Sequence, residues 1–264
     1  MAKIIFERFF LKNGLTVLLH QDKNTPLAVV NVLYKVGSRN EHPSRTGFAH
    51  LFEHLMFSGS KNAPDYDTIV EQAGGENNAF TNADITNYYI NLPAANIESA
   101  LWLEADRMFQ LNINKTSLET QRKVVVEEFK QRYLNKPYGD ASLLLRPLIY
   151  TSHPYKWSTI GKEPSHIEQA TLEEVKSFYK TWYSPNNAIL SIAGNVETEK
   201  VKYLIDKWFG AIEPSSVPVI NLPVEPDKTQ RTFLEVERNV PASALYMAFL
   251  MCDRQNPLYY AYDM

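Results

Sequence analysis

Alternating apolar and polar positions predict strands in four stretches of the chain. Residues 15–22 (LTVLLHQD) are a β-prone run that follows the turn signal Asn13-Gly14. Residues 27–38 (LAVVNVLYKVGS) indicate a second, mostly buried strand. Residues 78–93 (NAFTNADITNYYINLP) alternate and are rich in Thr and Tyr, which predicts one or two strands, and residues 187–196 (NAILSIAGNV) predict another.

Helical spacing of apolar residues separates these stretches. The segment from residue 94 to 110 is amphipathic, and the long segment from 116 to 135 opens with the capping-box pattern of Thr116 and Glu119. The same capping pattern, Thr171 and Glu174, opens another predicted helix. The predicted helices lie within residues 42–57, 65–75, 94–110, 116–135, 171–183 and 197–210. Because strands and helices mix without a regular βαβ rhythm, we expect an α+β fold with a mixed, largely antiparallel sheet and helices packed on it.

The character of the chain changes after Gly210. Residues 213–229 are rich in proline and indicate an extended linker between domains. Residues 231–254 (RTFLEVERNVPASALYMAFLMCDR) resume strand-like patterning, but the stretch 230–264 is too short to bury a core of its own. We therefore expect a first domain at 1–212, a linker at 213–229, and the incomplete beginning of a second, similar domain at 230–264.

Composition narrows the class of protein. The chain has 264 residues, of which 44% are hydrophobic and 22% charged, as in ordinary soluble globular proteins. A net charge of -3 gives no electrostatic case for binding nucleic acid, and Cys252, the single cysteine, excludes an intrachain disulfide framework. No apolar run reaches the roughly 18 residues of a membrane span. The first residues lack the apolar region of a signal peptide, which favours the cytoplasm, or the periplasm if a leader has been removed.

Two histidines and a glutamate stand close together in residues 47–60 (GFAHLFEHLMFSGS). His50 and His54 are four residues apart with Glu53 between them, so a helix places all three on one face. Burying them among so many apolar residues is costly unless something binds them. Two imidazoles at this spacing can reach one zinc ion, and the order His-x-x-Glu-His is that of the inverted zincins. Glu53 is badly placed as a ligand but well placed to take a proton from a water on the metal.

A third ligand must come from another segment. Glu128 follows the apolar run VVV on the long predicted helix, where a buried carboxylate needs a cation. Glu127 is the competing choice, but it points about 100° away, and a solvated charge beside Lys123 and Lys130 is the favoured interpretation of it. The remaining histidines, namely His20, His42, His153 and His166, stand in settings typical of surface or structural residues.

Five motifs occur in an order that resembles one known family. They are GFAHLFEHLMFSGS, GGENNAFTNADITNYY, VVVEEF, HPYKWSTIG and YSPNNAILSIAGNV, and they cover nearly all of the first 210 residues. The chain resembles the insulinase-like (pitrilysin-type, inverzincin) zinc metallopeptidases, especially the small bacterial members related to mitochondrial processing peptidase. The resemblance implies one zinc ion per chain, held by His50, His54 and Glu128, with Glu53 as general base.

The resemblance also implies where substrate lies. Asn78, Ala79 and Phe80 would contact an extended peptide by strand addition at a sheet edge, which suits peptides and unfolded segments. An ordinary edge strand with polar residues remains the alternative for this stretch.

Two departures from the family pattern bear on activity. Many active members carry a glutamate beside the zinc site where this chain has Gln121. Family members also have a second, similar domain that closes over the site. The resemblance therefore implies a zinc endopeptidase that needs a second homologous domain or chain. A weakly active or non-catalytic subunit is the alternative, and a homo- or heterodimer stays open.

Overall fold

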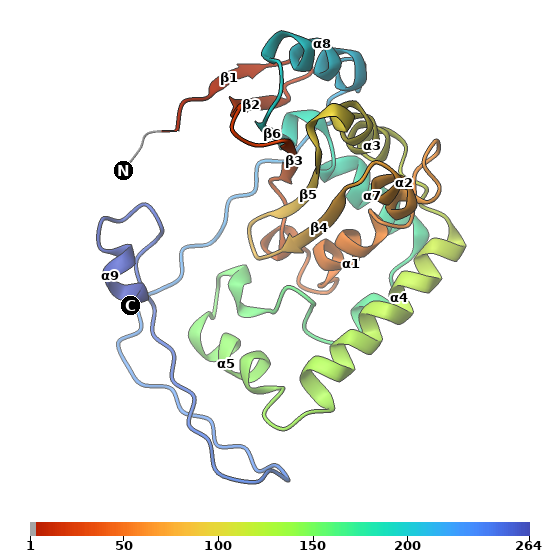
Figure 1. Cartoon of the computed structure of the whole chain (residues 1–264). Helices are drawn as coiled ribbons and strands as arrows, with labels where there is room; N and C mark the ends of the chain where they lie inside the picture. The colour runs from red at the N-terminus through yellow and green to blue at the C-terminus, as the bar shows by residue number, and fades with distance from the viewer. Residues whose placement is uncertain (1–3) are drawn as a thin grey trace.

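The structure is a computed structural model that describes residues 4–264. Within them, a six-stranded sheet has the strand order β1-β2-β6-β3-β5-β4 (Figure 1). β2 pairs with β6 in parallel, and the other neighbouring strands are antiparallel, which confirms the expected α+β class. The strands are β1 (Glu7–Phe10), β2 (Thr16–Gln21), β3 (Leu27–Tyr34), β4 (Glu76–Thr81), β5 (Thr86–Pro93) and β6 (Ala188–Gly194).

Helices pack on the sheet and on one another. α3 packs on β3 and β5, while α1 lies against β4 and is flanked by α4 and α7 (Figure 1). The α-helices are α1 (Phe48–Leu55), α2 (Tyr66–Gln72), α3 (Ile97–Gln110), α4 (Lys115–Phe129), α5 (Ala141–Ile149), α6 (Ser165–Glu168), α7 (Leu172–Trp182), α8 (Thr198–Phe209) and α9 (Tyr259–Asp263). Short 3-10 turns cover Ser38–Asn40, Ala94–Asn96, Pro154–Lys156 and Pro185–Asn187, and a π-helical turn, Lys130–Leu134, follows α4.

The core lies on the helix-covered face of the sheet. On β3, Val30, Val32 and Tyr34 are fully buried, whereas the residues between them are half-buried. The ring of Tyr183 stacks on Phe52 of α1 at 5.0 Å between centroids and lies 4.7 Å from Tyr34. α1 is therefore held by aromatic packing on the side opposite its polar residues.

The structure corrects the start of the long helix. α4 is capped by Asn114, whose side chain accepts from the Ser117 amide at 3.0 Å, while the Ser117 hydroxyl accepts from the Asn114 amide. The predicted capping box of Thr116 and Glu119 is therefore wrong, because asparagine caps a helix as well as threonine does and stands two residues earlier. The box of Thr171 and Glu174 on α7 is confirmed.

The strands expected in residues 231–254 are also wrong. The structure assigns no strand to these described residues, which run as extended chain away from the sheet (Figure 1). A strand needs a neighbouring strand to satisfy its backbone groups, and none of the described segments pairs with this one. Many of its apolar side chains are exposed, including Phe233 and Phe249 at 65% and 83%.

Candidate metal centre

The candidate centre begins with helix α1, which carries three of the predicted residues. Gly47 is its N-cap in a left-handed conformation, with φ at +91°, and the helix runs from Phe48 to Leu55. Phe48, Leu51, Phe52 and Leu55 are buried in the core, so the opposite face presents His50 and His54 towards α4. The rings of His50 and His54 are 4.9 Å apart between centroids.

Glu128 of α4 completes a cluster with these imidazoles. Its carboxylate oxygens lie 3.7 Å from Nε2 of His50 and 3.2 Å from Nε2 of His54. One ligand atom from each residue lies within 4.8 Å of the others, a spacing that one ion can bridge. The structure therefore brings together two residues of one helix and a carboxylate 74 positions later in the sequence.

Electrostatics at the cluster favour the forms that bind a metal. Burial lowers the pKa of His50 to about 4, although the Glu128 charge opposes that shift, so this imidazole is neutral at pH 7. The hydrogen bond from His54 lowers the pKa of Glu128 against the effect of desolvation, which keeps the carboxylate ionised. Neutral imidazole and ionised carboxylate are the ligand states that a divalent cation requires.

The donor set fits zinc. Two imidazole nitrogens and one carboxylate oxygen are the protein ligands of a common class of catalytic zinc site, which keeps a fourth position for water. Within the described residues, Nδ1 of His50 is buried and has no hydrogen-bond partner. Only about a tenth of the His50 side chain is exposed. Its Nε2 lies 3.7 Å from the nearest Glu128 oxygen, beyond hydrogen-bond distance, so with the ring proton on Nδ1 this nitrogen keeps a lone pair for a cation.

Glu53 lies on the same helix, between His50 and His54 in the sequence, and its side chain is half-buried. Its charge contributes to raising the pKa of Tyr88 and of Tyr183, although burial is the main cause for both phenols. The Tyr88 hydroxyl donates to the Phe52 carbonyl of α1 at 3.3 Å. The Glu53 charge therefore acts on the buried tyrosines that pack against this helix.

The alternatives on α4 are separated by their contacts. Glu127 is about half exposed and lies 3.8 Å from Lys130, as expected for a solvated charge. Gln121 donates from Nε2 to the Ser58 hydroxyl at 3.2 Å, which links α4 to the residues that follow α1. Gln121 therefore ties α4 to the turn that follows the histidine-bearing helix.

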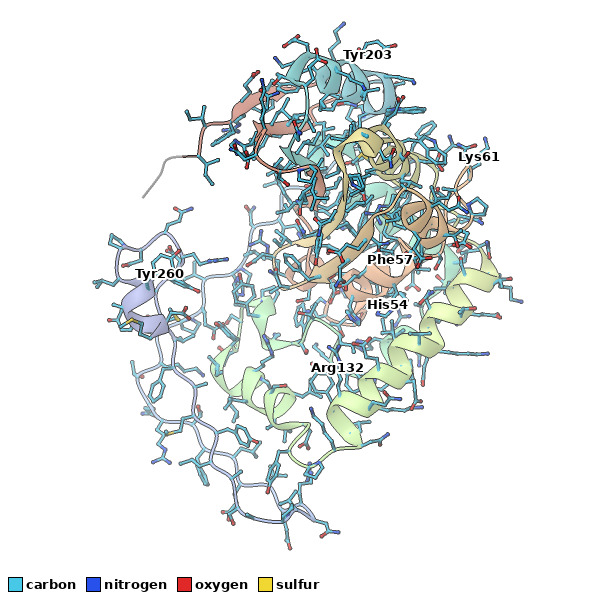
Figure 2. All side chains as sticks on the ribbon, viewed as in Figure 1. His54, Phe57, Lys61, Arg132, Tyr203 and Tyr260 are labelled. Atoms are coloured by element: carbon cyan, nitrogen blue, oxygen red, sulfur yellow. The ribbon has the colours of Figure 1, made fainter. Side chains whose placement is uncertain are left out.

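Arg132 is a residue of the cluster that the sequence reasoning missed. Its guanidinium lies 3.1 Å from the Glu128 carboxylate, on the π-helical turn that follows α4. In Figure 2, His54 and Arg132 lie near each other between α1 and the end of α4. The spacing of four residues from Glu128 on a predicted helix was the signal that could have found it.

The three residues expected to contact substrate lie on β4, an outer strand of the described sheet. β4 is adjacent to α1, and Asn78 and Phe80 are exposed while Ala79 is half-buried. The Ala79 amide donates to the Asn78 side chain at 2.8 Å. The edge of the sheet beside the cluster is thus formed by the predicted stretch.

The remaining histidines lie outside the cluster, as expected. His20 bonds to the Ile5 carbonyl, His42 to the Ser44 hydroxyl, and His153 accepts from the Tyr155 amide. His166 lies on the short helix α6 with only 12% of its side chain exposed, so of the two expected settings its own is structural.

Comparison with known proteins identifies the family. The model of insulinase (peptidase family M16) matches residues 16–143, and that of the peptidase M16 inactive domain matches residues 169–264. The chain is 40% identical over 210 residues to zinc protease PqqE of Helicobacter pylori, covering 78% of this chain and 47% of that protein. It is 31% identical over 209 residues to the probable mitochondrial-processing peptidase subunit beta of Schizosaccharomyces pombe, covering 78% and 45%.

A solved structure supports the same relationship. The crystal structure of a protease from Helicobacter pylori superposes with a TM-score of 0.79 at 38% identity, over 85% of this chain and 55% of that one. The chain spans about half the length of the curated relatives that it matches. Within residues 4–264, no helix combines the length and the apolar character needed to cross a membrane.

Proposed function

Because this chain belongs to the insulinase-like (pitrilysin-type) family of peptidases, we propose that it is a zinc-dependent endopeptidase. The observation that carries the proposal is the convergence of His50, His54 and Glu128 on one point between α1 and α4. We propose these three residues as the ligands of one zinc ion per chain. Bound there, zinc would supply Lewis acidity and lower the pKa of its water towards ~7.

The chain's own residues then divide the remaining work. Glu53 takes the proton from the attacking water and passes it to the nitrogen of the leaving amine. Its half-buried position on the ligand-bearing helix α1 supports this role. Gln121 and Arg132 hold α4 and the Glu128 carboxylate in position through the contacts at 3.2 Å and 3.1 Å.

A matched variant separates binding from chemistry. Glu53→Gln keeps the shape of the side chain but removes the base, so it should bind one zinc ion and lose at least about 100-fold in turnover of an unstructured peptide. Zinc content by mass spectrometry and cleavage of a fluorogenic peptide measure the two properties. Turnover equal to that of wild type, in a preparation whose wild type cleaves the peptide, would remove Glu53 from the mechanism.

We propose that substrate binds as an extra strand along β4. An extended peptide would contact Asn78, Ala79 and Phe80, and the Ala79 amide would exchange its side-chain acceptor for a peptide carbonyl. In the Glu53→Gln background, which prevents cleavage, Ala79→Pro removes that donor. The double variant should bind an unstructured peptide more weakly and retain zinc, and equal binding would place substrate elsewhere.

We propose a first domain at 1–212, a linker at 213–229 and the beginning of a similar second domain at 230–264. Support comes from β6, which lies between β2 and β3 and therefore belongs to the first unit although the second family model begins at 169. Limited proteolysis should cut first within 213–229, and a first cut inside the sheet would refute these boundaries.

A second homologous domain or chain is proposed to close the site, as in a homo- or heterodimer. The alternative is a weakly active or non-catalytic subunit in such an assembly. Peptide cleavage measured for the chain alone, and after addition of a second-half domain, distinguishes them: the enzyme proposal expects activity at least in the mixture.

The cytoplasm is the proposed location, with the periplasm as its alternative, and cell fractionation tests it.

A further inference from the structure

Helix α1 begins without a side-chain cap of its own. Its N-cap is Gly47, so the first amides find acceptors elsewhere. The buried carboxylate of Glu41 accepts from the amides of Gly47 and Ala49, both at 2.9 Å. A Cβ at Gly47 would lie 2.6 Å from the Ile160 carbonyl oxygen, so the loop before α6 presses directly on the start of α1. Distant parts of the chain therefore fix where this helix begins.

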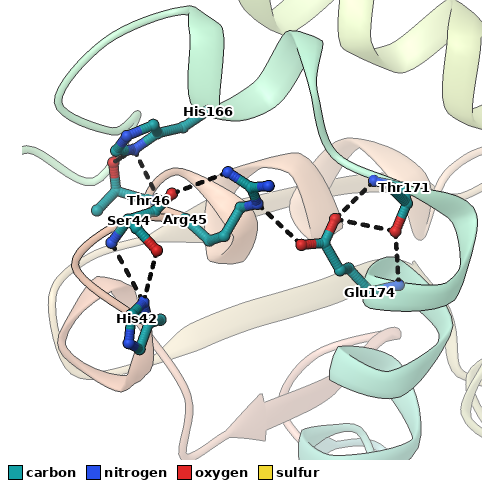
Figure 3. Close-up of polar contacts among 7 residues, drawn as sticks. All are labelled: His42, Ser44, Arg45, Thr46, His166, Thr171 and Glu174. Carbon is teal, nitrogen blue, oxygen red and sulfur yellow. Dashed lines mark hydrogen bonds and ion pairs between the residues drawn. The ribbon is translucent and has the colours of Figure 1, made fainter.

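Thr46, the residue before the N-cap, is tied to the segment that leads into α6. It is fully buried, and its amide lies 3.1 Å and its hydroxyl 2.8 Å from Nδ1 of His166 (Figure 3). The Thr46 hydroxyl also accepts from the Lys162 amide at 2.9 Å. With that lone pair used, the hydroxyl proton is available to His166.

These contacts fix the protonation state of His166. A backbone amide can only donate, so Nδ1 must be an acceptor and the ring proton must sit on Nε2. Nε2 faces the Glu163 carboxylate at 3.0 Å, a suitable acceptor for that proton. An imidazolium would direct its Nδ1–H at the Thr46 amide and lose the bond from that amide, and the Thr46 hydroxyl would have to turn its own proton away.

We infer that His166 is a positioning residue for the proposed metal site, because its unprotonated Nδ1 holds Thr46 and thereby the first turn of the helix that carries His50, Glu53 and His54. His50 lies one helical turn beyond Thr46. The inference rests on the proposed function for its link to zinc, but the hold, meaning the two bonds between Nδ1 of His166 and Thr46, is a property of the fold.

The charges around His166 set its dependence on pH. Burial lowers its pKa from 6.5, Glu163 opposes that shift, and Lys162 and Arg45 add to it. Arg45 is itself paired with Glu174 of α7 at 2.8 Å (Figure 3), and from α4 the Arg122 guanidinium reaches the far end of α6 at the Glu168 carbonyl. Since the folded state disfavours the imidazolium, the hold is complete above pH ~6.5 and weakens as pH falls below it.

Two conservative variants isolate the acceptor. His166→Asn places an amide oxygen near the position of Nδ1 and cannot be protonated, whereas His166→Gln places its polar group near Nε2 and leaves Thr46 without an acceptor. In zinc-free protein at pH 7.5, hydrogen-exchange protection of residues 44–51 should fall about tenfold in His166→Gln and stay within about twofold of wild type in His166→Asn. Zinc affinity, measured by competition with a chromophoric chelator, should fall about five- to tenfold in the Gln variant only.

The pH dependence of hydrogen exchange distinguishes the acceptor role of His166 from a role in packing, which would not depend on its protonation. Between pH 7.5 and 5.5, the protection of residues 44–51, corrected for intrinsic exchange, should fall more in wild type than in His166→Asn. Equal losses in the Asn and Gln variants, or no loss in either, would overturn the inference. If the Gln variant does not fold, Thr46→Val, which keeps the amide and removes the hydroxyl, should show a smaller loss of protection, and no loss contradicts the hold. A wild-type chain that binds no zinc would refute the proposed function and leave the exchange result standing.

Discussion

Arg107 of α3 tests the packing beneath α1, the helix that carries the two histidines of the candidate centre. It is 1% exposed, and its guanidinium donates to Glu104, which is fully buried and also accepts from the Tyr66 hydroxyl at 2.9 Å. The guanidinium carbon lies 4.6 Å and 4.4 Å from the ring centroids of Tyr66 and Tyr88. Tyr88 in turn bonds to the Phe52 carbonyl of α1. The pair thus lies one layer below the ligand-bearing helix.

The expected cost of Arg107→Met follows from this burial. Methionine fills much of the volume but leaves the Glu104 carboxylate buried with Tyr66 as its remaining donor. Breaking a buried ion pair in this way costs about 3–5 kcal/mol, and each lost cation–π contact adds about 0.5–1 kcal/mol. Allowing for the packing that methionine recovers, we expect a net loss of about 4 kcal/mol, which for a chain of this size lowers Tm by roughly 10 °C.

Urea unfolding followed by circular dichroism measures this loss against two controls. Lys207→Met breaks an ion pair with Glu98 in which both side chains are more than 40% exposed, so it should cost less than about 1 kcal/mol. The double variant Glu104→Leu/Arg107→Met removes both charges and should recover all but about 1–2 kcal/mol, the remainder being the unpaired Tyr66 hydroxyl. An Arg107→Met loss no larger than that of Lys207→Met would refute the reasoning.

Two further predictions concern the start of α1 and the contact between residue 225 and residues 151–153. Gly47→Ala should lower the free energy of unfolding by more than about 2 kcal/mol, because it combines a left-handed φ with a contact to the Ile160 carbonyl. Gly74→Ala, at φ +71° with no atom nearer than 3.5 Å to the new Cβ, should cost about 1 kcal/mol. Thermal melts compare the two variants, and equal losses would contradict the steric argument. Glu225 accepts from the amides of residues 151–153, and although desolvation opposes them these bonds lower its pKa to about 2 from 4.5. Its docking is therefore complete above pH ~4.5 and is lost as pH falls towards 2, so exchange protection of 151–153 should decline over that range in wild type. In Glu225→Gln, which keeps only one acceptor oxygen and no charge, protection should be weaker and should not follow this titration, and protection equal to that of wild type would refute the contact.

The sequence predicted most of the elements that position the centre, for physical reasons that are local. The spacing of His50, Glu53 and His54 needs only a helix, and the structure provides that helix with its apolar residues in the core. Glu128 lies about one helical turn after the buried Val125 on α4, whereas Glu127 points to the opposite side, so the position of the core decided between them. Period-two alternation located β3 and β6 because only one face of the sheet is deeply buried.

Other features depend on contacts between distant segments, which no local pattern reveals. His166 was expected to be unremarkable because nothing in its neighbourhood shows that Thr46 lies against it. The residue that caps α4 differs from the predicted one because Asn114 and Thr116 are both good caps, and the choice between them depends on how the chain leaves α3. Residues 231–254 have the composition of strands, but composition does not supply a pairing partner.

The central claim is that one zinc ion is held between α1 and α4, and anomalous diffraction at the zinc edge from crystals of zinc-supplemented protein tests it most directly. The account predicts a single strong peak within bonding distance, roughly 2.0–2.2 Å, of Nε2 of His50, Nε2 of His54 and a carboxylate oxygen of Glu128. Metal-replete crystals with no peak among these three side chains, or with zinc bound elsewhere on the chain, would contradict it.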